Sequence, residues 1–511
     1  MTSLPKGLTT RLVPTWTRPA RFSLAIHTPR TPKHKTPVPV VDLVPATAAR
    51  AMSNAADLAT VPAPPAALAN GVPPRPDYSP RYIDIGINLA DPIFRGRYRG
   101  KQQHPDDLAG IVQRARDVGC SRLIVTGSSF KSSRDALKLA GDFPNTVFAT
   151  AGIHPCSSAI FERRHTRHHE VDLDDDAEEH TPACGPDPTK PHAEDSDIDL
   201  AKSAQLIEEL RKLVLTAEPT NALVALGEMG LDYDRLHFCS ASTQRHAFAA
   251  QLALVADLAA AGHQLPLFLH SRAAHADFLR LLKDQFGPTL EKLPRGGVVH
   301  SFTGTMAEAQ EMMDLGLYLG VNGCSLKTME NCDVVRAIRL DRLMLETDGP
   351  WCEVRPTHEG WKYLVKVAEA ARTKAEEAEE ARKAAEKAAE DAARQVAEQA
   401  AQEAAATATA DGNATPNGVA AGNGRPPRPP RQKKQNNNGA NNNSKKKEPV
   451  VPERFKVVKK EKWVEGAMVK GRNEPCTIER IATIVAAIKG VPVEEVCEAA
   501  WANTVKVFGT A

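Results

Sequence analysis

Short apolar runs alternate with longer stretches of helical periodicity in the region from Tyr82 to Trp351. The runs are continuously apolar, which is the pattern of parallel strands that are buried on both faces of a sheet. Eight such runs follow one another: YIDIGINL from Tyr82, SRLIVTGSS from Ser121, TVFATAGIHP from Thr146, NALVALGEMGLD from Asn221, QLPLFLHSR from Gln264, GGVVHSF from Gly296, YLGVNGC from Tyr318 and RLMLETDGPW from Arg342. Eight strands with intervening helices predict an α/β fold of the (β/α)8 TIM-barrel type.

The strand-and-helix pattern of the barrel covers only part of the chain. Residues 1–80 are rich in Pro and Ala with little periodicity, so we expect a disordered N-terminal extension there. The barrel itself is predicted to span residues 81–365. Apolar periodicity returns at Cys476 and indicates two consecutive helices. We therefore expect residues 451–511 to contain C-terminal helices that complete the barrel domain.

Two insertions interrupt the pattern. Residues 161–199 contain the run HTRHHEVDLDDDAEEH and lack core-forming residues, so we expect a mobile insertion whose five histidines are solvated rather than metal-bound. Residues 366–450 begin with an Ala-, Glu- and Lys-rich stretch that favours helix at almost every position. Pro-, Asn- and Lys-rich low-complexity sequence follows it. We interpret this second insertion as a solvated helical spacer and a linker, although its lysine clusters are also compatible with a nuclear signal.

Charge and cysteine usage narrow the class of protein. The chain has 65 basic and 63 acidic residues, so any nucleic-acid contact must be local rather than a property of the whole surface. No apolar run approaches the length of about 20 residues that a membrane span needs, so we expect no membrane contact. The nine cysteines lack CxxC spacing and favour a reducing compartment, cytoplasmic or nuclear. No acidic residue precedes Asp42, a composition that also suits a mitochondrial transit peptide.

Acidic and imidazole side chains fall at the ends of four predicted strands. Glu228 ends VALGE, His270 ends PLFLH, His300 ends GGVVH, and Asp348 ends LMLETD. A single histidine in such a place is more often structural than a ligand. Four groups that converge on one barrel mouth would be costly to desolvate without a cation to share their charge. Because barrels present ligands at the carboxyl ends of strands, this pattern predicts a metal-assisted hydrolase.

The sequence resembles the TatD family of metal-dependent deoxyribonucleases, within the amidohydrolase-like barrels. The residues that carry the resemblance are IDIGINL, DPIFRGRYRGKQQH, AGIHP, GEMGLDYDR, FLHSR, HSFTGT, NGCSLKT, ETDGPW and the late RNEPC, in the order of the family. The resemblance implies that Glu228 bridges two divalent ions, with His270 and His300 on one and Asp348 on the other. It further implies hydrolysis of DNA phosphodiester bonds by a metal-activated water that Asp348 orients or deprotonates, including 3'–5' exonucleolytic cleavage.

One position pair departs from many relatives, which begin with Asp-x-His-x-His. The aligned residues here are Gly86 and Asn88, as in the branch of the family with DIGxNL. An amide oxygen is a weaker ligand than imidazole for transition metals, so a second metal site is in doubt and one or two ions are expected. Mg²⁺ or Mn²⁺ are favoured over Zn²⁺ because they accept oxygen ligands.

Further residues near the strand ends are candidates for contact with the substrate. His154 in AGIHP resembles a family residue near the scissile phosphate, and a packed structural histidine is an equal alternative. Arg272 is a candidate phosphate ligand, and Asp232 is a candidate to fix a histidine tautomer. Arg99 belongs to a basic cluster with Arg95, Arg97, Lys101 and Tyr98 that suits a phosphate backbone, although a solvated loop explains it equally well.

The expected substrate is therefore DNA, or RNA, while protein partners are not predictable. Two alternative functions stay open at this point. A metal-dependent hydrolase of the same fold could act on another ester, such as an aminoacyl-tRNA. An adaptor could use residues 366–450 for binding, with the barrel as a scaffold. The four candidate ligands argue against the adaptor, because a scaffold has no need to keep them together.

Overall fold

The computed structural model describes residues 78–163, 190–410 and 451–510, with the side chains of α8 described as far as 405. Eight parallel strands form one sheet in the order β1-β4-β5-β6-β7-β8-β9-β10. They are β1 (Tyr82–Ile87), β4 (Cys120–Val125), β5 (Val147–Ala151), β6 (Leu223–Asp232), β7 (Leu267–Arg272), β8 (Gly297–Val299), β9 (Tyr318–Val321) and β10 (Leu343–Leu345). The first and last strands meet at their carboxyl ends, where Asp348 N donates to Gly86 O and Asn88 N donates to Gly349 O, both at 2.8 Å. The predicted (β/α)8 barrel is confirmed.

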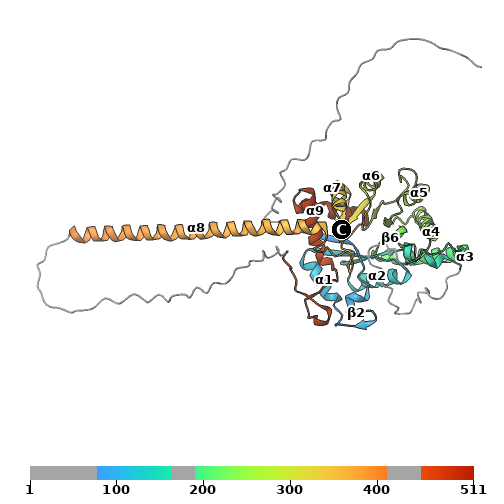
Figure 1. Cartoon of the computed structure of the whole chain (residues 1–511), viewed down its shortest axis with the longest axis horizontal. Helices are drawn as coiled ribbons and strands as arrows, with labels where there is room; N and C mark the ends of the chain where they lie inside the picture. The colour runs from blue at the N-terminus through green and yellow to red at the C-terminus, as the bar shows by residue number, and fades with distance from the viewer. Residues whose placement is uncertain (1–77, 164–189, 411–450, 511) are drawn as a thin grey trace, which may run out of the picture. The chain divides into compact units, whose positions relative to one another are not determined.

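Helices between the strands lie around the sheet (Figure 1). They are α1 (Leu108–Asp117), α2 (Phe130–Asp142), α3 (Leu200–Ala217), α4 (Ala241–Ala260), α5 (His275–Phe286), α6 (Met306–Asp314) and α7 (Met329–Ala337). Three more helices follow the last strand: α8 (Glu359–Ala410), α9 (Ile478–Lys489) and α10 (Val493–Phe508). Local sequence starts several of them: the side chains of Ser129, Thr305 and Thr328 each accept a hydrogen bond from the third residue of α2, α6 and α7. Such capping fixes the loop that leads from a strand end into its helix.

Apolar side chains fill the inside of the barrel. Ile83, Ile85, Ile124, Phe268 and Met344 form a buried cluster that also includes Val507 and Phe508 from the end of α10. The side chain of Asn503 in α10 donates to Leu340 O and Leu343 O, at the start of β10, at 2.8 Å each. Helix α10 therefore covers the amino-terminal ends of the strands, and the opposite end is left for polar side chains.

The RNEPC segment is anchored to the barrel by a buried group of charges. Arg472 and Glu474 contact Asp107 and Arg114, which lie immediately before and within α1. The four side chains are at most 3% exposed, and each cation faces two carboxylates at 2.5 to 2.8 Å. Breaking such a pair would leave an uncompensated buried charge, so this group fixes the C-terminal segment to the first helix.

Residues at the edges of the predicted N-terminal extension and of the first insertion contact the barrel. The hydroxyl of Tyr78 donates to Glu498 of α10 at 3.0 Å, so residues 78–80 join the barrel rather than the N-terminal extension. Phe161 is fully buried, and a bridge joins Glu162 to Ile198, so both ends of the insertion at 161–199 are held by the barrel. His192 is exposed, while His165, His168, His169 and His180 lie outside the described residues.

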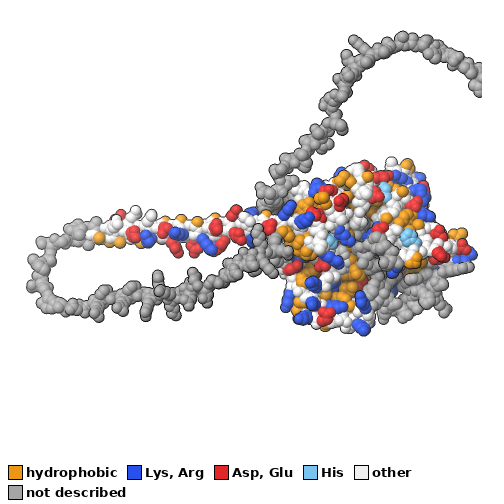
Figure 2. Space-filling view, viewed as in Figure 1, with side chains coloured by type: hydrophobic (Ala, Val, Ile, Leu, Met, Phe, Trp, Pro, Cys, Tyr) orange, Lys and Arg blue, Asp and Glu red, His pale blue; other side chains and the backbone are white. Residues whose placement is uncertain are grey.

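The helical part of the second insertion begins earlier than the predicted residue 366. Helix α8 starts at Glu359, and its first turns pack against α9 with Leu364 buried and Trp361 half-buried. From Glu369 to Ala405 almost every side chain is exposed, with i,i+4 pairs such as Arg394–Glu398. Figure 2 shows charged side chains in red and blue interspersed with orange and white along this helix. No helix in the described ranges has the length and apolar character that crossing a membrane requires.

Candidate active site

Five polar side chains lie near the carboxyl ends of four consecutive strands. His154 follows β5 and His300 follows β8, while Glu228 and Asp232 belong to β6 and His270 belongs to β7. Each is buried, with at most 7% of its surface exposed. This end of a TIM barrel is where active sites lie, and α10 covers the other end.

Glu228 occupies the centre of this group. Its Oε1 lies 2.6 Å from His300 Nε2 and 3.0 Å from His270 Nδ1, and these two nitrogens are 3.4 Å apart. Burial alone would raise the pKa of Glu228, but His154 and His300 outweigh it and hold the pKa well below its ordinary value. Glu228 is therefore a carboxylate at neutral pH.

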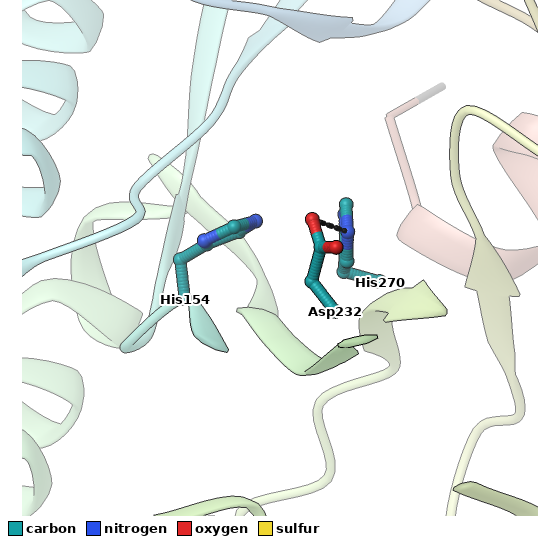
Figure 3. Close-up of side chains that lie close together, drawn as sticks. All are labelled: His154, Asp232 and His270. Carbon is teal, nitrogen blue, oxygen red and sulfur yellow. Dashed lines mark hydrogen bonds and ion pairs between the residues drawn. The ribbon is translucent and has the colours of Figure 1, made fainter. Parts of the chain in front are cut away.

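A second carboxylate lies behind each of the two histidines. Asp232 Oδ2 is 3.1 Å from His270 Nε2, and Glu346 Oε2 is 3.4 Å from His300 Nδ1. Figure 3 marks the Asp232–His270 contact with a dashed line. An imidazole that donates its outer N–H to a carboxylate presents a bare lone pair on its inner nitrogen. Burial alone would lower the pKa of His300, but Glu228 and Glu346 hold it well above its ordinary value, so without a metal its Nε2 carries a proton toward Glu228. A bound cation would take the place of that proton and accept lone pairs from His270 Nδ1 and His300 Nε2.

The donor set fits a divalent cation. Two imidazole lone pairs and one carboxylate oxygen within this small space would repel one another unless a cation or a proton lies between them. Imidazole with carboxylate is a common donor set for divalent transition metals, and the outer carboxylates are the partners that metal-bound histidines usually have. Among the described residues, the groups close enough to share an ion are Glu228–His270–His300 and His154–Asp232–His270. The site is thus compatible with a metal.

The predicted ligand Asp348 lies on the other side of the barrel mouth and does not join either group. Asn88 Nδ2 donates to Asp348 Oδ1 at 3.0 Å and to Gly349 O at 3.2 Å. Cys352 Sγ donates to Asp348 Oδ2 at 3.2 Å. Asn88, proposed from the sequence as a substrate contact, therefore presents its amide N–H groups to Asp348 and its neighbour.

Glu346 is a residue of the site that sequence reasoning missed. Its carboxylate is fully buried and accepts hydrogen bonds from Ser301 N and from Asn322 Nδ2. A Cβ atom at Gly86 would lie 2.5 Å from Glu346 Oε2, and one at Gly320 would lie 2.9 Å from Oε1. Glycine at position 86 therefore leaves room for the Glu346 carboxylate. The available signal was its place next to Thr347 in LETD, at the end of the same strand as Asp348.

His154 faces the central carboxylate from the third strand. Its Nε2 lies 3.4 Å from Glu228 Oε1, and its Nδ1 accepts a hydrogen bond from Cys156 N at 3.0 Å. Burial lowers the pKa of His154 to about 3, so the ring is neutral near pH 7. Because Nδ1 accepts, Nε2 carries the proton and is a hydrogen-bond donor into the site.

The three remaining predicted contacts differ in position. Asp232 is fully buried and held by His270, Arg235 and Arg272, an environment that suits a group that orients His270. Arg272 lines a pocket with Ser271 and Thr303 at the mouth. Arg99 is exposed at the two-residue turn between β2 (Arg97–Tyr98) and β3 (Lys101–Gln102), with left-handed φ values at Arg99 and Gly100.

An eight-stranded parallel barrel with imidazole and carboxylate donors at its carboxyl end defines the class of metal-dependent hydrolase barrels. Residues 83–398 match the model of the family described as TatD related DNase. The chain therefore belongs to the TatD family, and the predicted family and hydrolase class are confirmed.

Individual relatives agree with this assignment. The chain is 34% identical to "Deoxyribonuclease Tat-D" of Schizosaccharomyces pombe, over 84% of this chain and 96% of that protein. It is 35% identical to "3'-5' ssDNA/RNA exonuclease TatD" of Rahnella sp., over 53% of this chain and 78% of that protein. A crystal structure of an uncharacterized amidohydrolase from Saccharomyces cerevisiae is similar, with a TM-score of 0.57, 28% identity, and coverage of 84% of this chain and 100% of that one.

Proposed function

We propose that this protein is a divalent-metal-dependent deoxyribonuclease that hydrolyses DNA phosphodiester bonds, with 3'–5' exonucleolytic direction. The observation that carries the proposal is the convergence of His270 Nδ1 and His300 Nε2 on Glu228 Oε1, backed by Asp232 and Glu346. The name of the Rahnella relative supports the direction and adds single-stranded RNA as a substrate to test.

Glu228, His270 and His300 would hold the ion, with Asp348 as the candidate ligand for a second one. Such an ion, when bound, supplies positive charge that stabilises the charge developed in phosphodiester hydrolysis. Mg²⁺ or Mn²⁺ are the proposed ions, because Asp348 and Asn88 add only oxygen and amide groups on the other side of the mouth. The two imidazoles also make Zn²⁺ a reasonable metal to test.

His154 would donate a hydrogen bond to the substrate. Its neutral ring carries the proton on Nε2, which faces the centre of the site. A phosphate oxygen beside Glu228 would be a better acceptor for this N–H than bulk water. With a pKa near 3, His154 is a poor general acid at neutral pH, so its role is to bind and orient a phosphate oxygen.

Asp348 would orient the attacking water and accept its proton. The carboxylate is half-buried and held on both oxygens, by Asn88 and by Cys352. A carboxylate fixed in this way loses little conformational entropy when it takes its catalytic position. Asn88 is then a positioning residue for Asp348.

A pocket beside Asp348 suits single-stranded nucleic acid. Tyr98 from β2 and Trp351 from the loop after β10 line it together with Lys459, Lys460 and Lys470. Lys460 Nζ lies 4.9 Å from the centre of the Tyr98 ring, and Lys459 and Lys470 are exposed. Aromatic rings that stack on bases, next to cations that neutralise phosphates, are the usual means of binding single strands.

The proposal is tested with purified protein that has been stripped of metal. End-labelled single- and double-stranded DNA and single-stranded RNA are incubated with Mg²⁺, Mn²⁺ or Zn²⁺, and the Glu228→Gln protein serves as the control. We expect metal-dependent cleavage by the wild type with a product ladder from the 3' end. A folded wild type that cuts none of these polymers but hydrolyses an aminoacyl ester would refute the nuclease assignment.

A further inference from the structure

Two cysteines that are distant in sequence lie in contact beside the candidate site. Cys324 is in the short helix η5 (Gly323–Leu326) after β9, and Cys352 follows Asp348 by four residues. Their sulfur atoms are in hydrogen-bond contact at 2.7 Å, and no disulfide bond joins them. A disulfide bond needs about 2.05 Å, so the sulfurs have less than about 1 Å to move.

The main chain holds these two thiols together. A Cβ atom at Gly323 would lie 1.9 Å from Cys352 O, so the backbones of the two segments are pressed together. Cys352 adopts a left-handed φ of 55°, and Cys324 N donates to Asn322 Oδ1 at 2.8 Å. The Cys324 side chain is buried, while Cys352 is half-buried and is the more exposed residue of the pair.

Each member of the pair is connected to the site by hydrogen bonds. Cys352 Sγ donates to Asp348 Oδ2 at 3.2 Å. On the other side, Asn322, which caps the helix of Cys324, donates to Glu346 Oε1 at 3.3 Å and to Ser301 Oγ at 2.9 Å. A covalent change at the sulfurs therefore acts on residues that contact Asp348 and Glu346.

We propose that Cys324 and Cys352 form a redox-sensitive pair that closes to a disulfide under peroxide and lowers hydrolysis. The Cys352 thiolate attacks one peroxide oxygen, the O–O bond breaks, and a sulfenic acid and water form. The Cys324 thiolate then attacks the oxidised sulfur and displaces hydroxide, which leaves as water. Two thiols and one hydrogen peroxide thus give one disulfide and two waters, and a thiol reductant reverses the change.

Closure removes the S–H group that donates to Asp348 Oδ2. The carboxylate would then face a sulfur that has only lone pairs, and the loop after β10 would be tied to η5. Losing a hydrogen bond to a charged group lowers a rate by about tenfold. The activity part of this inference rests on the proposed nuclease function, whereas the pairing itself does not.

The first experiment detects the bond without any turnover. Metal-free full-length protein is treated with hydrogen peroxide, the peroxide is removed with catalase, and tryptic peptides are analysed by mass spectrometry without reduction. We expect the peptide that ends at Lys327 to be joined to the peptide that begins at Leu343. A protein whose other cysteines are oxidised while these two peptides stay separate overturns the proposal.

The second experiment connects the bond to activity. The oxidised wild type is expected to cut DNA about tenfold more slowly than the reduced protein, with recovery after dithiothreitol. Cys324→Ser, or Cys324→Ala if the serine variant is unstable, should stay active after peroxide, and Cys332→Ala should respond like the wild type. Equal inhibition of the Cys324 variant, or a disulfide without any change in rate, overturns the switch. A reduced wild type that cuts no nucleic acid would instead refute the nuclease assignment.

Discussion

The two sides of the barrel mouth differ in chemistry. On the β6–β8 side, His270 and His300 converge on Glu228, and each imidazole is backed by a carboxylate. On the β10–β1 side, Asp348 is held by the amide of Asn88 and a thiol, and no histidine stands at position 86. The β6–β8 side alone carries enough donors for a metal site. The β10–β1 side supplies one carboxylate, which is held in a hydrogen-bond network. The comparison separates a side that carries metal donors from a side that supplies one hydrogen-bonded carboxylate, and the variants below test our proposal that Asp348 acts on the attacking water.

Removing the central carboxylate should have the largest effect. Glu228→Gln keeps the shape of the side chain but removes the charge that both histidines share. We expect DNA cleavage to fall by about 10³-fold or more, together with a loss of metal binding measured by calorimetry. The exposed Glu311→Gln on α6 is the control and should behave like the wild type. If Glu228→Gln still cleaved DNA at the wild-type rate, the β6–β8 side would not be the metal site that cleavage requires.

Changing the isolated carboxylate should have a smaller effect and leave one ion bound. Asp348→Asn removes a base, so we expect the cleavage rate to fall by about 10²-fold, while Mn²⁺ affinity on the histidine side is kept. Asn88→Ala, which frees one oxygen of Asp348, should lose about tenfold. Mn²⁺ stoichiometry and rates measured on the same protein samples separate the roles. If Asp348→Asn abolishes all metal binding, then Asp348 belongs to the primary site.

The pocket lined by Lys459 and Lys470 lies beside the Asp348 loop, so we expect substrate to bind on this side of the barrel mouth. Lys459→Ala combined with Lys470→Ala should weaken binding of single-stranded DNA about tenfold and reduce the salt slope of the affinity by about 1.4, as expected for two phosphate contacts. Fluorescence anisotropy at several salt concentrations measures both. Lys366→Ala with Lys387→Ala on α8 removes the same charge elsewhere, and equal losses in the two double variants would contradict a local site.

The smallest effect concerns stability and tests the buried network behind β1. Burial raises the pKa of Asp84 to about 8, although hydrogen bonds from Thr347 oppose the shift. The folded protein therefore holds a proton that the unfolded chain, with a pKa of about 3.9, releases. The protonated Asp84 carboxyl therefore contributes to the free energy of unfolding at low pH. This contribution is lost as the pH rises from about 3.9 through about 8. Asp84→Asn does not titrate.

Urea unfolding of metal-free protein between pH 5 and pH 8 checks this expectation. The free energy of unfolding of Asp84→Asn, relative to the wild type, should increase with pH by up to about 1.4 kcal/mol per pH unit. Thr347→Val provides the comparison, because it removes the hydroxyl that donates to Asp84 but leaves the carboxyl group titratable. A difference between Asp84→Asn and the wild type that does not change with pH would mean that Asp84 is ionised in the folded protein.

Much of the fold and part of the site were predictable because the signals are local. A continuous apolar run predicts a buried parallel strand, and the polar residue that ends it must lie at the barrel mouth. His270 and His300 follow from this argument, and so does Glu228, although its strand continues to Asp232. The start of α8 was less predictable, because Trp361 and Leu364 pack on α9, which comes more than a hundred residues later in the chain.

The sequence by itself determined that this chain forms a barrel of the TatD family and which strands carry the nitrogen and oxygen donors. Only the tertiary structure decided which of those donors contact one another on each side of the barrel mouth. It places Glu346 behind His300, turns the amide of Asn88 toward Asp348, and brings Cys324 into contact with Cys352. The physical reason is that periodicity specifies which face of an element is buried. Contacts between residues far apart in the chain depend instead on the register and packing of several elements at once.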